Sequence, residues 1–290
     1  MPQKFSMTGG SAALSRATAR HSSFRQGRRW RFAPLCGGAF FHRCYGGDIT
    51  ALCGDGVFSR ARGGTIDAMR VLYHLTLSPC SRKVRLVLAE KNLEFTLKLE
   101  KTWERRPEFL ALNPAGEVPV LIEPDGTVLA ATEAIIEYLD ETYREKILIG
   151  INPVDRAEVR RLSGWFDGKM NLEVTENLLG EKMMRRHFGY GQPNSQAIRA
   201  GHANLGYHLD YIGFLVERRR WLAGDHYSVA DISAAAHLSS LDYIGDVPWD
   251  EHEPAKEWYA RIKSRPSFRQ ILADHVPGTS PPKHYTDLDF

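Results

Sequence analysis

The chain has 290 residues, of which 43% are hydrophobic and 25% charged, a composition typical of a soluble globular protein. No run of about 18 consecutive apolar residues occurs, which argues against a membrane-spanning helix. The formal charge of +3 is unevenly placed, because residues 1–67 carry 10 of the 38 basic residues and 3 of the 35 acidic ones. Residues 68–290 therefore hold 28 basic and 32 acidic residues, a net charge of −4, which gives no electrostatic reason to expect nucleic-acid binding.

Residues 1–68 show no sustained helical or strand periodicity and are rich in Gly, Ser and Arg. Three interpretations of this extension stay open: an organellar transit peptide, a disordered basic arm, or sequence upstream of a true start at Met69. We favour the third, because Met69 directly precedes a clean strand pattern.

The cysteines follow the same division. Cys36, Cys44 and Cys53 lie in the extension, and only Cys80 lies beyond it. A single thiol cannot form an internal disulfide in the main body and suits a reducing compartment, so we expect a cytoplasmic protein. The spacing of the other three cysteines matches no zinc motif, and we predict no metal site.

The main body begins with the pattern of a small mixed sheet. Val71, Tyr73 and Leu75 alternate as in a strand, and a Ser78-Pro79 turn then starts an amphipathic helix that ends near Asn92. The patterns that follow predict a strand at 94–99, a short helix before Pro114, two strands joined by a turn at 125–126, and a helix at 132–143. The order βαβαββα is the layout of a thioredoxin-like α/β domain, to which we assign residues 69–148.

Strand patterns stop after Gly150. Residues 153–245 and 254–275 show helical periodicity, with breaks at 189–194, 224–227 and 245–248, so we expect an all-α second domain over residues 149–275. The tail, residues 276–290, contains three prolines and is not expected to be helical. Its last residues alternate acidic and apolar side chains, which is typical of a peptide that docks into a partner's groove. The alternative is a tail that packs on the chain's own helices.

Three short motifs follow one another along these elements. Ser78-Pro79-Cys80-Ser81 joins the first strand to the first helix, residues 113–121 read NPAGEVPVL, and residues 223–235 read AGDHYSVADISAA. Together they resemble the glutathione S-transferases over residues 69 to about 275. The resemblance implies that family's fold, a thioredoxin-like α/β domain followed by an all-α domain, with a cis Val118–Pro119 bond. In the third motif, Ser228 and Asp231 have the spacing of a capping box at a helix start.

The resemblance also implies a glutathione site. Ser78 or Cys80 would stabilise the glutathione thiolate, while Val118, Pro119 and Thr132 would hold the rest of the tripeptide. Thr132 is expected to cap the helix that it begins, where the N-terminus favours a ligand carboxylate. The alternative for Cys80 is a small packing residue at a helix start.

Ala131 departs from the family's pattern, which usually places an acidic residue before the serine or threonine of this helix. Glu133 comes one place late, and adjacent residues on a helix point about 100° apart. Losing one charge-assisted hydrogen bond costs about 1.5–3 kcal/mol, or roughly ten- to hundredfold in affinity. An enzyme that conjugates or reduces small electrophiles, with glutathione as ligand or co-substrate, is therefore the alternative function rather than the favoured one.

Residues 69–91, residues 103–121 and the ending HYTDLDF resemble one branch of this family, whose members bind the tubulin-like division protein FtsZ. The resemblance implies a homodimeric scaffold that binds FtsZ filaments and the division machinery at the division site and promotes constriction, with little or no transferase activity. It implies no cofactor. Trp103, in a charged loop, is the candidate anchor for this partner, unless it folds onto its own domain. The candidate contacts in the tail are Tyr285, Asp287, Leu288, Asp289 and Phe290.

Overall fold

The computed structural model describes residues 69–185, 189 and 191–288. All of these residues belong to one compact unit of the chain. The predictions made for residues 1–68, Asp289 and Phe290 lie outside the described residues and stay predictions.

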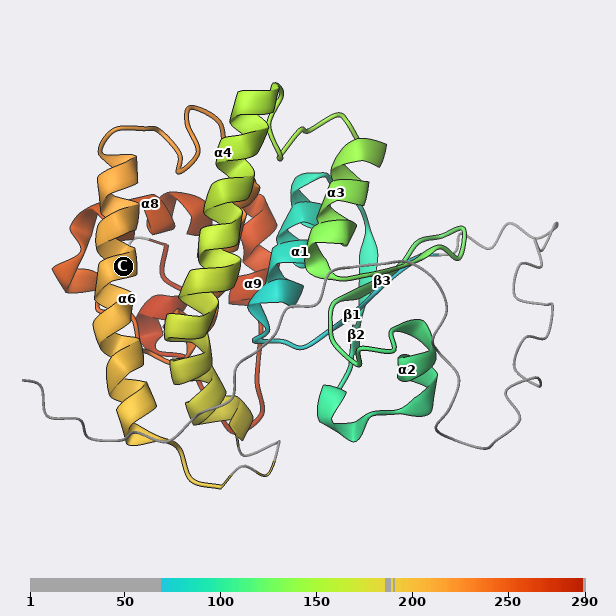
Figure 1. The fold of residues 1–290 in the computed structure, drawn as a ribbon, viewed down its shortest axis with the longest axis horizontal. Helices are drawn as coiled ribbons and strands as arrows, with labels where there is room; N and C mark the ends of the chain where they lie inside the picture. Colours follow the sequence, from blue (N-terminus) through green and yellow to red (C-terminus); the bar gives the residue numbers. More distant parts are fainter. Residues whose placement is uncertain (1–68, 186–188, 190, 289–290) are drawn as a thin grey trace, which may run out of the picture. The chain divides into compact units, whose positions relative to one another are not determined.

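A four-stranded sheet with the order β2-β1-β3-β4 forms the first part of this unit (Figure 1). Its strands are β1 (Arg70–His74), β2 (Phe95–Leu99), β3 (Val120–Ile122) and β4 (Val128–Ala130). β1 and β2 are parallel, so the chain has to cross over between them, and it does so through α1 (Pro79–Glu90). β3 pairs antiparallel with both β1 and β4. With α2 (Pro107–Leu112) and α3 (Thr132–Thr142) in the remaining places, the predicted order βαβαββα is confirmed.

Successive side chains of β1 pack into two different hydrophobic clusters, one on each side of the sheet. Leu72 belongs to the main core, which it shares with residues of α1 and α3. Its neighbour Tyr73 belongs to a smaller core on the side of α2, where its ring lies 5.5 Å from the ring of Phe109. Figure 1 shows α1 and α3 on one side of the sheet and α2 on the other, as expected for a thioredoxin-like domain.

Helices make up the rest of the described unit, as predicted. α4 (Pro153–Gly164) continues directly into η3 (Trp165–Met184), which has π-helical hydrogen bonding, and then come α6 (Ser195–Val216), α7 (Val229–Tyr243), α8 (Glu253–Lys263) and α9 (Arg269–Leu272). The short 3-10 turns are η2 (Thr102–Glu104), η4 (Trp249–Glu251), η5 (Pro266–Phe268) and η6 (Lys283–Tyr285). Among the described residues, no helix combines the length and the apolar character needed to cross a membrane.

The central helix of this part is α7, all of whose residues are buried. The predicted capping box fixes its start: the Ser228 hydroxyl accepts from the Ala230 N–H at 3.3 Å, and the Asp231 carboxylate accepts from the Ser228 N–H at 3.1 Å. The same carboxylate accepts from Trp258 Nε1–H at 3.1 Å, so the box also ties α7 to α8.

The predicted domain boundaries lie in coil, one between α3 and α4 and the other soon after α9. A single hydrophobic core nevertheless extends across both, from Leu72 in β1 to Tyr285 in η6. The division into an α/β domain, a helical domain and a tail therefore stays a prediction.

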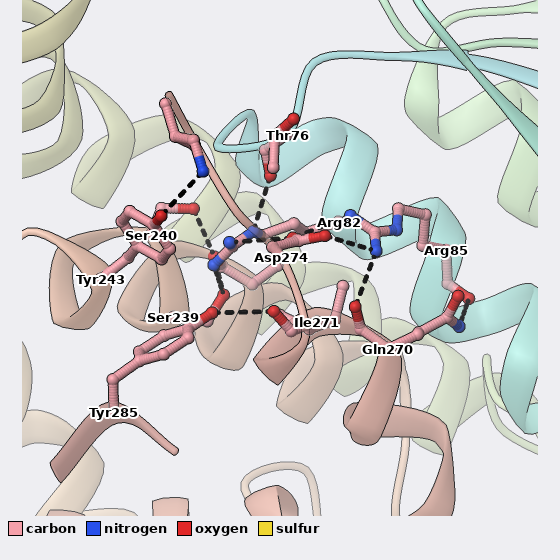
Figure 2. A network of polar contacts seen from close by, with 12 residues as sticks. Thr76, Arg82, Arg85, Ser239, Ser240, Tyr243, Gln270, Ile271, Asp274 and Tyr285 are labelled. Atoms are coloured by element: carbon pink, nitrogen blue, oxygen red, sulfur yellow. Dashed lines mark hydrogen bonds and ion pairs between the residues drawn. The ribbon is translucent and has the colours of Figure 1, made fainter. Parts of the chain in front are cut away.

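Buried arginines of α1 tie this helix to α7 and to the segment after α9 (Figure 2). Arg82, which is fully buried, donates to the Thr76 carbonyl at 2.9 Å, to Ser239 Oγ at 2.9 Å and to Asp274 Oδ2 at 3.0 Å. Arg85 donates to both carboxylate oxygens of Asp274 at 2.9 Å. Since a buried charge is costly unless it is paired, Asp274 is the group that makes the burial of both guanidinium groups tolerable.

Candidate functional site

The first turn of α1 carries the two candidate thiolate-stabilising groups. Ser78 is the N-cap, and its hydroxyl accepts from the Ser81 N–H at 3.3 Å. Cys80 follows on the first turn and is half-buried. Burial raises the pKa of the Cys80 thiol, and a hydrogen bond with the Thr132 side chain opposes this only in part. Because the thiolate is the reactive form, Cys80 is a weaker nucleophile at neutral pH than an ordinary cysteine.

The start of α3 differs from its predicted form. The residue in the N-cap position is Ala131, with φ of +71°, and Thr132 is the first helical residue. The prediction that Thr132 caps this helix is therefore wrong, because the chain enters the helix one residue earlier and no side chain caps it. Thr132 is instead buried beside Cys80, so the structure does bring these two predicted residues together.

Glu133 is the acid nearest to Ala131 along α3. Its side chain is largely exposed, and its carboxylate lies 3.9 Å from Lys83 Nζ in α1. Lys83 is buried and has a closer partner in Asp167 of η3. Glu133 is thus directed toward α1 and its ion pair, which agrees with the expectation that it does not replace an acid at position 131.

The Val118–Pro119 bond is cis, as the sequence resemblance implied. It directly precedes β3, while α3 begins soon after β4, the neighbouring strand of the sheet. Val118 is half-buried and Pro119 is buried. The segment predicted to hold the glutathione backbone is therefore present with the predicted backbone geometry.

An apolar groove of about 460 Å³ lies beside Ser78. Four segments line it: the turn at 75–79, the segment from Leu99 to Trp103, the C-terminal part of η3, and the start of the tail. The apolar lining residues that the sequence analysis missed are Leu75, Leu77, Leu99, Leu179, Met183, Met184, Val276 and Pro277. The four-residue spacing of Leu179 and Met183 was a usable signal, but it does not distinguish a groove from a core.

Trp103 lies in η2 and is half-buried as part of the groove lining. Ser78, a candidate for thiol chemistry, and Trp103, a candidate partner anchor, thus line the same groove. A half-buried Trp in an apolar groove is typical of the aromatic anchors found in protein interfaces.

The tail is in part packed on the chain's own helices. Tyr285 is fully buried, its ring packs edge-on against Tyr243 at 5.2 Å, and its hydroxyl donates to the Ile271 carbonyl at 3.0 Å. The prediction that Tyr285 contacts a partner is therefore wrong, because its surface is used within the chain. Asp287 and Leu288 are exposed, and their predicted role as partner contacts stays a prediction.

Comparisons with known proteins extend over most of the described chain. The family model "Glutathione S-transferase, N-terminal domain" matches residues 77–142. FtsZ-localized protein A from Caulobacter vibrioides (strain NA1000 / CB15N) is 50% identical over 224 residues, which span 76% of this chain and 98% of that protein. The chain belongs to the glutathione S-transferase family.

Two solved structures of glutathione S-transferase fold are also similar. A glutathione S-transferase from Rhodospirillum rubrum F11 is 56% identical, with a TM-score of 0.75 over 77% of this chain and 100% of that one. FzlA from C. crescentus is 50% identical, with a TM-score of 0.74 over the same shares of the two chains. The resemblance seen in the sequence, to the family and to its FtsZ-localized member, is confirmed.

The residues that the sequence analysis assigned to a glutathione site are only partly in the form that is usual for the family. The cis Val118–Pro119 bond, the serine cap of α1 and the buried Thr132 are in place. The acidic side chain that the family usually has before Thr132 is missing, and the pKa of the nearby Cys80 thiol is raised by burial. An ammonium group bound beside Thr132 would therefore lack a charged contact from position 131.

Proposed function

We propose that this protein is a glutathione S-transferase-fold scaffold that binds FtsZ filaments and promotes constriction in bacterial cell division, with little or no transferase activity. The observation that carries the proposal is the groove, in which Trp103 and the Ser78 turn form parts of one apolar lining. The 50% identity to FtsZ-localized protein A over 98% of that protein supports FtsZ as the partner and the cytoplasmic division site as the location.

The groove suits an apolar segment of a protein better than a small reactive molecule. Trp103 and two methionines, Met183 and Met184, contribute to a mainly apolar lining, and Lys101 and Glu176 add one charge of each sign. Interfaces combine an apolar centre with polar groups that fix orientation in this way, and methionine adapts to irregular partner surfaces. Cys80, whose thiol pKa is raised by burial, is not among the described residues that line this groove.

A homodimer would strengthen binding to a filament. Tyr207 and Phe214 lie seven residues apart on α6, and thus on one face of it, with 74% and 51% of their surfaces exposed. Leu172 on η3 is 62% exposed. Large exposed apolar side chains of this kind favour burial against a second copy. Two grooves in one dimer would engage two FtsZ subunits of the same filament, which raises avidity without any new contact.

Co-sedimentation tests the proposal. The full chain is incubated with FtsZ, which is assembled into filaments with GTP or kept unassembled with GDP, and the pellets are compared. We expect the chain to pellet in a saturable manner with filaments and to stay in solution alone. A chain that stays in the supernatant at every filament concentration would refute FtsZ binding.

The second candidate function is glutathione-dependent catalysis, favoured by the cis Val118–Pro119 bond and by Thr132 beside Cys80. Ala131 provides its test, because this residue is exposed and stands where the family usually has an acidic residue. Ala131→Glu should raise glutathione affinity by roughly ten- to hundredfold, since it restores one charge-assisted hydrogen bond. Isothermal titration calorimetry measures the change, with Ala131→Gln as the uncharged control.

Wild-type binding of glutathione tighter than about 1 mM, or roughly −4 kcal/mol, would favour the enzyme and call for substrate screening with Ser78→Ala and Cys80→Ala. Equal affinities of the wild type, Ala131→Glu and Ala131→Gln would show that position 131 does not control this site.

A further inference from the structure

The segment after α9 forms one wall of the groove. Val276 and Pro277 line it, and the Val276 carbonyl accepts from the Thr279 N–H at 3.1 Å. Pro277 in the second position and Gly278, with φ of +81°, in the third position are the residues that suit a type II turn. This wall, the Val276–Thr279 turn, is therefore held by local hydrogen bonds and not by a helix.

The hydroxyl of Tyr243, at the end of α7, closes the turn from inside the protein. It accepts from the Val276 N–H at 2.9 Å and donates to the Thr279 carbonyl at 3.0 Å. Tyr243 is fully buried, so it presents this hydroxyl from a fixed position. The Thr279 hydroxyl also donates to Met183 Sδ at 3.9 Å, which links the turn to the wall formed by η3.

Both flanks of the turn belong to the buried network that surrounds Tyr243 (Figure 2). Before the turn, Asp274 pairs with Arg82, whose guanidinium lies 5.9 Å from the centre of the Tyr243 ring. After the turn, the Tyr285 ring packs on Tyr243 with the two planes at 80°. After the turn the tail therefore contacts Tyr243 directly, through Tyr285, whereas before the turn Asp274 is linked to Tyr243 only through Arg82.

We propose that Tyr243 is a positioning residue for the groove, because its hydroxyl fixes the Val276–Thr279 turn as one wall of it. Through this hydroxyl, docking of the tail on Tyr243 is coupled to binding of FtsZ in the groove. This inference rests on the proposed function of the groove. Anything that detaches Tyr285 from Tyr243 also loosens the turn, so a partner that pulls on the exposed end of the tail weakens binding in the groove. The coupling acts through the Val276–Thr279 turn, which Tyr243 holds and from which the tail continues to Tyr285.

Tyr243→Phe tests the inference in the full chain, because it removes the hydroxyl and keeps the ring. Tyr227→Phe is the matched control, since Tyr227 does not line the groove and its buried hydroxyl has no hydrogen-bond partner among the described residues. We expect Tyr243→Phe to speed amide hydrogen exchange in residues 274–280 and to lower the affinity for FtsZ filaments about fivefold. Tyr227→Phe should change neither quantity.

Gly278→Ala changes the same turn without altering Tyr243 or the hydrogen bonds of its hydroxyl directly. Gly278 has a positive φ, and no atom of the described residues lies within 4 Å of an added Cβ, so the substitution strains the turn backbone. Gly126→Ala in the β3–β4 turn is its control, with φ of +89° and equally open surroundings. Gly278→Ala should weaken FtsZ binding, and Gly126→Ala should not.

Trp103→Ala in the same assay separates the two proposals. If Trp103→Ala abolishes binding while Tyr243→Phe and Gly278→Ala bind like their controls, the coupling is refuted and the groove remains the FtsZ site. If Trp103→Ala binds like the wild type, the proposed function of the groove fails, and the coupling fails with it. Unchanged hydrogen exchange in Tyr243→Phe refutes the positioning role whatever FtsZ does.

Discussion

Trp103→Ala should lower the affinity of this protein for FtsZ filaments by at least about thirtyfold, or 2 kcal/mol, the usual threshold of an interface hot spot. Trp103 is half-buried in the groove lining, so alanine both removes apolar contact area and opens the groove to water. Co-sedimentation over a range of filament concentrations measures the change.

Trp221→Ala is the matched control for this loss. Trp221 is also half-buried, but it packs against Tyr227 and two arginines and does not line the groove. It should leave FtsZ affinity within about threefold of the wild type, provided that circular dichroism shows a folded chain. Similar losses in both variants would mean that Trp103 acts through stability and not through contact with FtsZ.

Asp274→Ala should lower the free energy of unfolding by about 3–5 kcal/mol, because it leaves the guanidinium groups of Arg82 and Arg85 buried without their carboxylate. Urea denaturation followed by tryptophan fluorescence measures the loss. Glu217→Ala provides the contrast, since the Arg218–Glu217 pair is exposed on both sides and such pairs contribute about 0–1 kcal/mol. A loss below about 1 kcal/mol in Asp274→Ala would show that water or other groups compensate the two arginines.

The sheet and its helices were predictable because their signals are local. Alternation along residues 71–75 determines which side chains of β1 face each layer, and the Ser78-Pro79 pair marks the start of α1 within a few residues. The capping box at Ser228 and Asp231 is local in the same sense. The resemblance to glutathione S-transferases supplied the cis bond before Pro119, which no local pattern predicts.

The buried arginines of α1 could not be predicted in this way. A stretch such as Ser81–Arg85 has the composition of a solvated helix face. Arg82 is nevertheless buried, because it forms an ion pair with Asp274, 192 residues further along the chain. Tyr285 was misassigned for the same reason. Its acidic and apolar neighbours suggest a docking peptide, but its partners Tyr243 and Ile271 lie elsewhere in the chain.

The groove could not be predicted from local sequence patterns either. It is assembled from four segments that are distant in the sequence, and only Trp103, Ser78 and Cys80 were singled out near it. The capping role of Thr132 was wrong because it depended on the backbone of a single residue. With φ of +71°, Ala131 takes the cap position itself, a conformation that the sequence does not signal for alanine.

Methionine oxidation footprinting tests the central claim, that FtsZ binds in this groove, most directly. Met183 and Met184 line the groove, Met69 is 53% exposed outside it, and Met170 is fully buried in the core. The account predicts that FtsZ filaments protect Met183 and Met184 from peroxide, while Met69 stays reactive and Met170 stays unreactive with or without filaments. Co-sedimentation without any protection of Met183 and Met184 would contradict the account, because FtsZ would then bind another surface.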